Sequence, residues 1–135
     1  MANECVITKF YGNNGDIAEY TCAEATDIPY GTLLELTDPH TVKKVSGAGC
    51  VVAGIAAEEF TGGQGRTTIG VYTNVEYKGT IIAGGSATLE STVRSAGATN
   101  EITLITTLDG ETGKDAGYAL ETGAATETIL VRLRK

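Results

Sequence analysis

Apolar residues alternate with polar ones over short runs, and Gly, Asn, Asp or Pro stands between most of these runs. Alternation with a period of two is typical of half-buried strands, and those residue types are typical of turns. The pattern predicts strands over residues 5–10, 17–22, 32–36, 41–45, 66–72, 80–83, 86–90 and 101–108. We interpret 74–79 as a connection and 91–98 as a loop or a short strand. Only 17–25 and 53–60 are rich in Ala and Glu, so we expect at most about one or two turns of helix.

One segment of the chain occurs twice. Residues 53–58, Ala-Gly-Ile-Ala-Ala-Glu, align with residues 116–121, Ala-Gly-Tyr-Ala-Leu-Glu. After three fewer intervening residues, Ile-Leu-Val at 129–131 aligns with Ile-Gly-Val at 69–71. Each copy contains a short apolar strand, a Glu, a turn of small residues and a second strand. The sequence therefore predicts two equivalent β-hairpins.

The repetition extends beyond the hairpins. Residues 28–32 can be laid on residues 82–86, and each precedes a strand and then a copy of the hairpin. This divides the chain into an N-terminal segment, 1–27, and a β domain with two related halves of about 28–79 and 80–135. Two copies are too few for a solenoid. We expect a mostly β, single-domain fold of sandwich or barrel type, with an internal hairpin repeat and little helix.

The N-terminal segment begins with residues that carry no evident structure of their own. Residues 1–4 are expected to become ordered only on binding. The turn at 11–16, Tyr-Gly-Asn-Asn-Gly-Asp, contains Asn and Gly, which accept positive φ. The strands on either side of this turn are predicted to pair with each other.

The length and composition place few demands on the fold. A chain of 135 residues forms one domain of ordinary size and can bury its core without disulfides or metal. The 18 Gly residues suit tight turns, and the absence of Trp leaves Ile, Val, Leu, Tyr and Phe to form the core. Cys5, Cys22 and Cys50 show no CxxC spacing, which argues against zinc or thioredoxin-like chemistry. Cys50, beside Val51, is interpreted as a small buried apolar residue.

The charge excludes some partners. With 17 acidic against 10 basic residues the net charge is −7, and no basic stripe offers a surface for nucleic acid. Arg132 and Arg134 alternate with apolar residues, so they are expected on the solvated face of a strand. The first residues lack the basic and apolar regions of a signal peptide, and no apolar run approaches the roughly 20 residues of a membrane span. We expect a soluble protein made in the cytoplasm, without membrane contact.

Candidate catalytic residues are few. His40 is the single histidine and stands between Pro39 and Thr41, where a solvent-exposed turn residue is expected rather than a catalytic base. Carboxylate pairs are present at Glu58/Glu59 and Glu24/Asp27, but nothing in the sequence supplies an apolar pocket with aromatic walls to separate their pKa values. We interpret both pairs as parts of solvated loops.

Two glycine-containing loops superficially suggest ligand binding. Residues 62–66, Gly-Gly-Gln-Gly-Arg, lack the spacing of a phosphate-binding loop and a following amphipathic helix. Residues 109–111, Asp-Gly-Glu, are too short for a calcium loop. The sequence therefore predicts no enzyme activity, no metal and no cofactor, and function is expected to lie in surfaces.

A resemblance to a known protein family indicates what kind of binding surface to expect. Residues 115–133 resemble the ending of small capsid decoration (cement) proteins of tailed bacteriophages, in which a Gly-x-Ala-Leu-Glu segment, an Ala-rich turn and a terminal Val-Arg-Leu strand recur. Residues 52–56, with Gly-Thr-Leu-Leu at 31–34 before them, are similar to the corresponding earlier part. The resemblance covers about residues 28–133. The loop at 62–65 and the segment before Ile28 depart from it.

The resemblance implies a non-enzymatic virion protein. Such proteins are made in the host cytoplasm, add to the outside of the head after it expands, and commonly form homotrimers. Their partner is the major capsid protein, whose neighbouring subunits they bridge against internal DNA pressure. A trimer that engages several subunits gains strength through effective concentration.

The N-terminal segment is our hypothesis for the contact with the capsid or with a neighbouring protomer. The candidate contact residues are Ala2, Asn3, Glu4, Val6, Ile7, Lys9 and Phe10. The alternative function is a carbohydrate- or surface-binding β module of a phage tail or fibre, which would require exposed aromatic residues beside polar groups. The six Tyr residues are scattered along the sequence, which disfavours that alternative. A small enzyme is the least favoured class.

Overall fold

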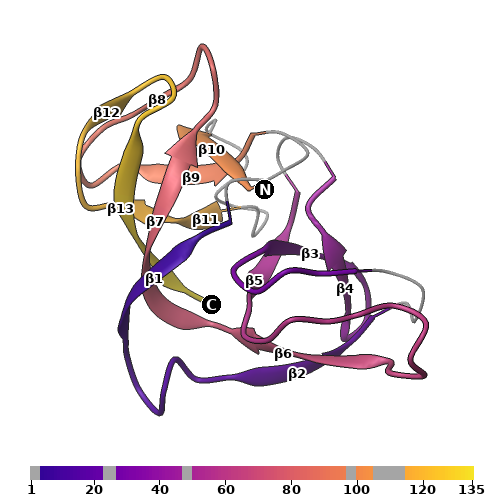
Figure 1. The fold of residues 1–135 in the computed structure, drawn as a ribbon. Helices are drawn as coiled ribbons and strands as arrows, with labels where there is room; N and C mark the ends of the chain where they lie inside the picture. The colour runs from indigo at the N-terminus through magenta and orange to yellow at the C-terminus, as the bar shows by residue number, and fades with distance from the viewer. Residues whose placement is uncertain (1–3, 23–26, 47–49, 97–99, 105–114) are drawn as a thin grey trace.

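The structure is a computed structural model that describes residues 4–22, 27–46, 50–96, 100–104 and 115–135 (Figure 1). Within these residues every regular element is a strand, which confirms the expected mostly β fold. The strands are β1 (Val6–Phe10), β2 (Ala18–Thr21), β3 (Leu33–Asp38), β4 (Thr41–Lys44), β5 (Val52–Ala56), β6 (Thr68–Tyr72), β7 (Asn74–Ile81), β8 (Ser86–Ala87), β9 (Thr92–Ser95), β10 (Glu101–Leu104), β11 (Asp115–Ala119), β12 (Gly123–Ala124) and β13 (Thr128–Arg134).

The strands form two barrels that lie side by side (Figure 1). The first barrel closes in the order β2-β4-β3-β5-β6. The second follows the order β7-β10-β9-β11-β13, and it closes as well because β7 pairs with both β10 and β13. β1 adds to the outside of β7. Each barrel interior is narrow enough for side chains alone to fill.

The two predicted hairpins are confirmed, and they pair in the same register. The pairs Ile55–Tyr72 and Ala56–Val71 of the first barrel correspond in the sequence alignment to Tyr118–Arg132 and Ala119–Val131 of the second. The strands that precede each hairpin also match. Each first hairpin strand pairs with β3 or β9 through a one-residue irregularity, which falls at Ala53 in β5 and at the aligned Ala116 in β11.

The duplication covers the whole barrel. The pairs Leu34–Lys44, Thr21–Thr41 and Ile28–Phe60 correspond to Val93–Leu104, Thr80–Glu101 and Ala87–Gly123. β2, β3 and β4 are thus the counterparts of β7, β9 and β10. The sequence overlay of residues 28–32 on 82–86 is wrong, because Ile28 occupies the place of Ala87.

Two predictions about strand pairing and extent are also wrong. β2 does not pair with β1 through the turn at 11–16; it pairs with β6, while β1 pairs with β7. The turn therefore carries the chain from one barrel to the other. Residues 74–79 are not a connection but most of β7, whose residues Val75, Tyr77 and Ile81 are fully buried. The turn-forming Asn74 and Gly79 concealed this alternation.

These pairings show at which residues each barrel begins in the sequence. β2 lies within residues 1–27, which were expected to stand apart from the two halves, yet its ladder with β6 makes it part of the first barrel. β7 crosses the expected boundary at residue 80 and opens the second barrel. The register, rather than composition, shows where each copy starts.

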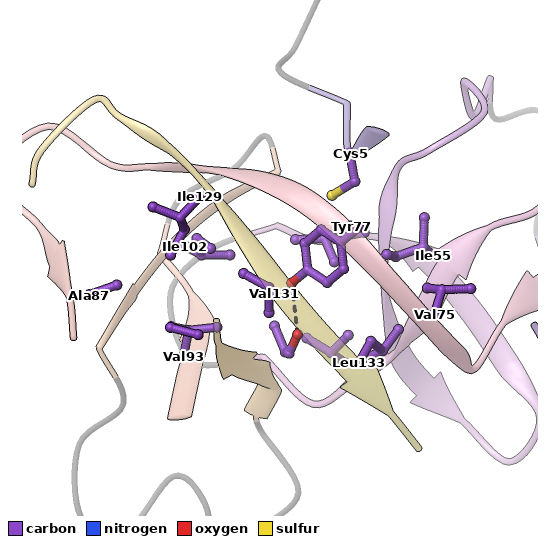
Figure 2. Close-up of a cluster of buried hydrophobic side chains, with 14 of the residues drawn as sticks. Cys5, Ile55, Val75, Tyr77, Ala87, Val93, Ile102, Ile129, Val131 and Leu133 are labelled. Carbon is purple, nitrogen blue, oxygen red and sulfur yellow. Dashed lines mark hydrogen bonds between the residues drawn. The ribbon is translucent and has the colours of Figure 1, made fainter. Parts of the chain in front are cut away.

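The buried side chains form two clusters. One fills the first barrel and includes Leu34, Phe60 and Val71. The other fills the second barrel and continues onto the outer face of the first, where Leu33 and Ile55 belong to it. Figure 2 shows Ile55 beside the residues of the second barrel. At its centre the hydroxyl of Tyr77 donates a 2.7 Å hydrogen bond to the carbonyl oxygen of Ala116. Burial raises the pKa of Tyr77 well above its ordinary value.

The hairpins require Gly at one equivalent position. A Cβ atom on Gly54 would lie 2.3 Å from the carbonyl oxygen of Tyr72, and one on Gly117 would lie 2.4 Å from that of Arg132. No other residue type lets the two backbones approach so closely. These glycines are the reason why the Ala-Gly dipeptide is present in both copies.

We expect Gly54→Ala and Gly117→Ala each to lower the free energy of unfolding by more than about 2 kcal/mol, because the backbones must separate. Gly63 is the matched control. Its φ is +77° but no atom lies within 4 Å of its Cβ position, so Gly63→Ala should cost only about 1 kcal/mol. Denaturant unfolding of the three variants checks this. Equal losses at all three positions would contradict the close-approach argument.

Glu58 and Glu121 occupy equivalent positions and make the same contact. Oε2 of Glu58 accepts a 2.8 Å hydrogen bond from the amide of Gly70, and Oε1 of Glu121 accepts one of 2.8 Å from the amide of Leu130. Burial alone would raise the pKa of Glu58, but the hydrogen bond from Gly70 and the guanidinium of Arg66 hold it below its ordinary value. Each carboxylate therefore ties the hairpin loop to the returning strand.

We expect Glu58→Gln to lower the free energy of unfolding at neutral pH by less than about 1 kcal/mol, because the side chain is 43% exposed. The folded-state pKa lies below the ordinary 4.5, so the stabilisation is complete above that pH and is lost as the pH falls through the folded-state pKa. Denaturant unfolding of both proteins at neutral and acidic pH checks this. A difference that grows toward acidic pH would contradict it.

Candidate interaction surface

β1 lies at the junction of the two barrels and is fastened to both. It pairs along its length with β7 of the second barrel. Just before it, the amide of Cys5 donates a 2.8 Å hydrogen bond to the carbonyl oxygen of Gly31 in the first barrel. The Cys5 side chain is 3% exposed, and burial raises the pKa of its thiol to about 12. The described part of the N-terminal segment is thus an integral strand rather than a projecting arm.

The sequence-predicted contact residues fall into three groups. Ala2 and Asn3 lie outside the described residues. Glu4 and Ile7 are half-buried, and Ile7 packs against the core that the second barrel shares with the first. The other three predicted contact residues are exposed on β1, namely Val6 (59%), Phe10 (48%) and Lys9.

An irregularity in β1 divides its exposed side chains between two directions. Ile7 pairs with Tyr77 and Lys9 pairs with Glu76, so Thr8 is an extra residue. Directly paired residues of antiparallel strands point to the same side of a sheet. Phe10, paired with the buried Val75, is therefore on the side of Ile7, whereas Val6 and Lys9 point outward.

Phe10 belongs to a group of aromatic side chains at the edge of the first barrel. Its ring centroid lies 5.2 Å from that of Tyr72, and the Tyr30 ring meets Tyr72 edge-on at 6.1 Å. The hydroxyl oxygens of Tyr30 and Tyr72 are 3.2 Å apart. Burial, followed by the contact with Tyr30, raises the pKa of Tyr72 to about 12. Such edge-on and tilted arrangements are favourable for aromatic pairs.

Ile17 extends this group over the outer face of β6. Its side chain covers Gly70, two residues before Tyr72 on the same face of the strand. Ile17 is 53% exposed and Tyr30 is 44% exposed. We call Phe10, Ile17, Tyr30 and Tyr72 together the aromatic patch.

The second barrel shows that the fold does not require this patch. The counterparts of Ile17 and Tyr72 are the polar residues Glu76 and Arg132. Arg132 stacks on the ring of Tyr11, 3.8 Å from its centroid, and donates a 2.6 Å hydrogen bond to the side-chain oxygen of Asn74. Exposed apolar side chains that gather on a soluble protein commonly mark an interaction site. The aromatic patch and the adjacent β1 therefore form the candidate interaction surface.

The other candidate residues take ordinary places. His40 is exposed in a turn with φ of +53°, and its ring lies 6.1 Å from that of Tyr20. Cys22 is buried like Cys5, whereas Cys50, expected to be buried, is only half-buried. Within the loop at 62–65, the amide of Gly62 donates a 2.7 Å hydrogen bond to Oδ1 of Asp27. Glu24 and residues 109–111 lie outside the described residues.

Arg66 and Glu58 form an ion pair beside a shallow hollow. The guanidinium carbon of Arg66 lies 5.1 Å from the centroid of the Phe60 ring. The hollow next to Phe60 has a volume of about 370 Å³ and is lined by Asp27, Ile28, Pro29, Glu59, Phe60 and Thr61. This lining offers two carboxylates and apolar walls.

Two further properties of the described residues concern metal ions and membranes. No group of three or more His, Cys, Asp and Glu side chains in this part of the chain is arranged to hold a metal ion. In the same residues no helix has the length and apolar character to cross a membrane.

The fold of this chain has a counterpart among solved structures. No family model and no curated protein match the sequence. The fold is similar to that of the N base of head fibre gp8.5 of bacteriophage phi29, with a TM-score of 0.53 and 13% sequence identity. The match covers 87% of this chain and 93% of the phage structure, so it includes strands of both barrels. The likeness is one of fold.

The sequence alone did not indicate the aromatic patch. Tyr30 and Tyr72 are 42 residues apart in the chain, and the six tyrosines look scattered until the barrel brings two of them together with Phe10. A signal was present in the repeat, since the second copy has Arg132 where the first has Tyr72. It becomes readable only once the register of the two copies is known.

Deletion of residues 2–10 should destabilise the whole protein rather than remove a peripheral arm. We expect the free energy of unfolding to fall by about 3 kcal/mol or more, because the β1–β7 ladder and the buried Cys5 are lost. Val6→Ser, at a residue that is 59% exposed, should change it by no more than about 0.5 kcal/mol. Thermal unfolding followed by circular dichroism checks both. A deletion variant that melts like the unaltered protein would contradict this assignment of β1.

Proposed function

We propose that this protein is a structural protein of a tailed-phage virion. It binds the outer surface of the head and stabilises the expanded shell by bridging major capsid subunits. Two independent likenesses support this: residues 115–133 resemble the ending of capsid decoration proteins, and the fold is similar to that of the phi29 head-fibre base. On this proposal the protein has no catalytic role, no cofactor, and no nucleic acid or membrane partner.

The main structural support for the proposal is the candidate interaction surface. β1 is held by β7 and by Gly31, so Val6 and Lys9 on its outer side are presented on a fixed scaffold. Phe10 connects this strand to the aromatic patch. A rigid apolar surface loses little conformational entropy when it binds, which suits attachment to a shell that is itself rigid. The major capsid protein is the proposed partner.

A homotrimer is the proposed state of the attached protein. Several linked surfaces that engage neighbouring subunits bind more strongly than one surface alone, because each attachment raises the effective concentration of the next. Bridging of adjacent subunits then follows from the geometry of attachment.

The proposal is tested by co-sedimentation with expanded heads from the phage that encodes the protein. We expect Val6→Glu and Phe10→Ser each to weaken binding at least tenfold, because they alter the two exposed sides of β1. Gln64→Glu is the matched control: it adds the same charge as Val6→Glu in an exposed loop and should bind normally. The unaltered protein should also raise the temperature at which empty heads disassemble. Absence of binding by the unaltered protein would refute the proposal.

The aromatic patch favours a second candidate, a carbohydrate-binding module of a phage tail or fibre. Exposed aromatic rings beside hydroxyl groups are suited to stacking on sugars, and Phe10 and Tyr30 both expose about half of their surface. Glycan-array binding that is lost in Tyr30→Ala, combined with indifference to heads, would replace the decoration function with this one.

A further inference from the structure

The contact between the two barrels joins two different surfaces. The first is the outer face of β3 and β5, where Leu33 and Ile55 are both 0% exposed. The second is the end of the second barrel, where Ser95 is 0% and Asn100 is 3% exposed. We call them the outer face and the barrel end. They are therefore complementary surfaces that one chain already brings together.

Hydrogen bonds, in addition to apolar packing, hold the two surfaces together. The amide of Leu33 donates a 2.8 Å hydrogen bond to Oδ1 of Asn100. The amide of Cys50 donates one of 3.0 Å to Oγ of Ser95. Side chains of the outer face also share one buried cluster with the interior of the second barrel.

Because the barrels are duplicates, each of these surfaces occurs twice in the chain. On the second barrel, the counterparts of Leu33 and Ile55 are Thr92 and Tyr118. On the first barrel, the counterparts of Ser95 and Asn100 are Leu36 and His40. His40 and Asn100 even share positive φ, at +53° and +61°.

The second copies of both surfaces are open. Tyr118 is 44% exposed where Ile55 is 0%, and Leu36 is 41% exposed where Ser95 is 0%. His40 is exposed and makes a ring contact with Tyr20. Tyr118 is therefore exposed on the outer face of the second barrel, and Leu36 is exposed on the barrel end of the first. Within the described part of this chain neither of these two surfaces contacts another barrel.

We infer that copies of this chain associate head to tail, with the outer face of one copy's second barrel against the barrel end of the next copy's first barrel. The occupant is a second copy because the structural counterparts of these two surfaces already pack against each other within the chain. Tyr118 would take the place of Ile55, and Leu36 and His40 would take the places of Ser95 and Asn100. This contact is heterologous, so it closes into a ring if the rotation between copies allows.

The composition of the open outer face suits a contact between separately soluble chains. Arg132 replaces Tyr72 and Asp115 replaces Val52, while Tyr118 places a large ring at the position of Ile55. Tyr and Arg are enriched in interfaces of this kind, whereas purely aliphatic faces are typical of permanent contacts. The inference goes beyond the homotrimer proposed for the attached protein, because it identifies the contacting surfaces and applies to the free protein without a phage head.

Sedimentation velocity and light scattering on the full chain test the inference. The unaltered protein should be an oligomer at high micromolar concentration. Tyr118→Glu and Leu36→Glu should each be monomeric, because each loses one of the two surfaces. An equimolar mixture of the two variants should form a dimer and nothing larger, since only one intact outer face and one intact barrel end remain to meet.

A monomeric unaltered protein would overturn the inference, as would oligomers that persist in either variant or a mixture that stays monomeric. Gln64→Glu carries the same charge change outside both surfaces and should assemble normally. Circular dichroism verifies that each variant is folded. If a Glu variant does not fold, Tyr118→Ser and Leu36→Ser remove the same apolar area without adding charge. Failure of the proposed function looks different: heads are not bound, while the self-association and its loss in these variants remain.

Discussion

β5 is buried along its entire length, and the arrangement of the molecule follows from that constraint. Ala53 and Ala56 line the interior of the first barrel, while Val52 and Ile55 belong to the cluster that the second barrel fills. A strand that is apolar on both faces cannot remain at the surface of an isolated barrel. The second barrel therefore completes the first, and the two cannot be treated as independent modules. β1 strengthens this junction because it pairs with one barrel and bonds to the other.

Within this frame the two copies have diverged where their surroundings differ. Inside the barrels the hairpin residues match closely, as with Val71 and Val131 or Ala56 and Ala119, whereas at other interior positions a large and a small residue are exchanged. On the outer faces they differ in character, as with Ile17 and Glu76. An interior is close-packed, so a change of size at one position must be compensated at another, whereas a surface is free to change with its partner. Differences between the two copies at outer positions therefore indicate what each surface contacts.

The sequence was sufficient to predict the all-β fold and both hairpins, because alternation and the Ala-Gly dipeptide survive in each copy. It was not sufficient to predict the full duplication. Ala18 corresponds to Tyr77 and Ile28 to Ala87, so the pattern of sizes is inverted even though the register is kept. The exposed residues of β1 were predicted as contact residues, but their fastening to β7 and the convergence of Phe10 with two tyrosines depend on long-range pairing. Such pairing leaves no local trace in one sequence.

The route of the chain has a consequence for its synthesis. β1 is made first, yet its partner β7 lies in the middle of the sequence, so β1 has no ladder to join while the strands of the first barrel emerge from the ribosome. β2 to β6 contain every strand of their own barrel and can close before β7 appears. Until then Ile7 and the apolar outer side of β5 remain uncovered, a state that favours association with chaperones or with other nascent chains. These residues become buried only after the second barrel has been translated.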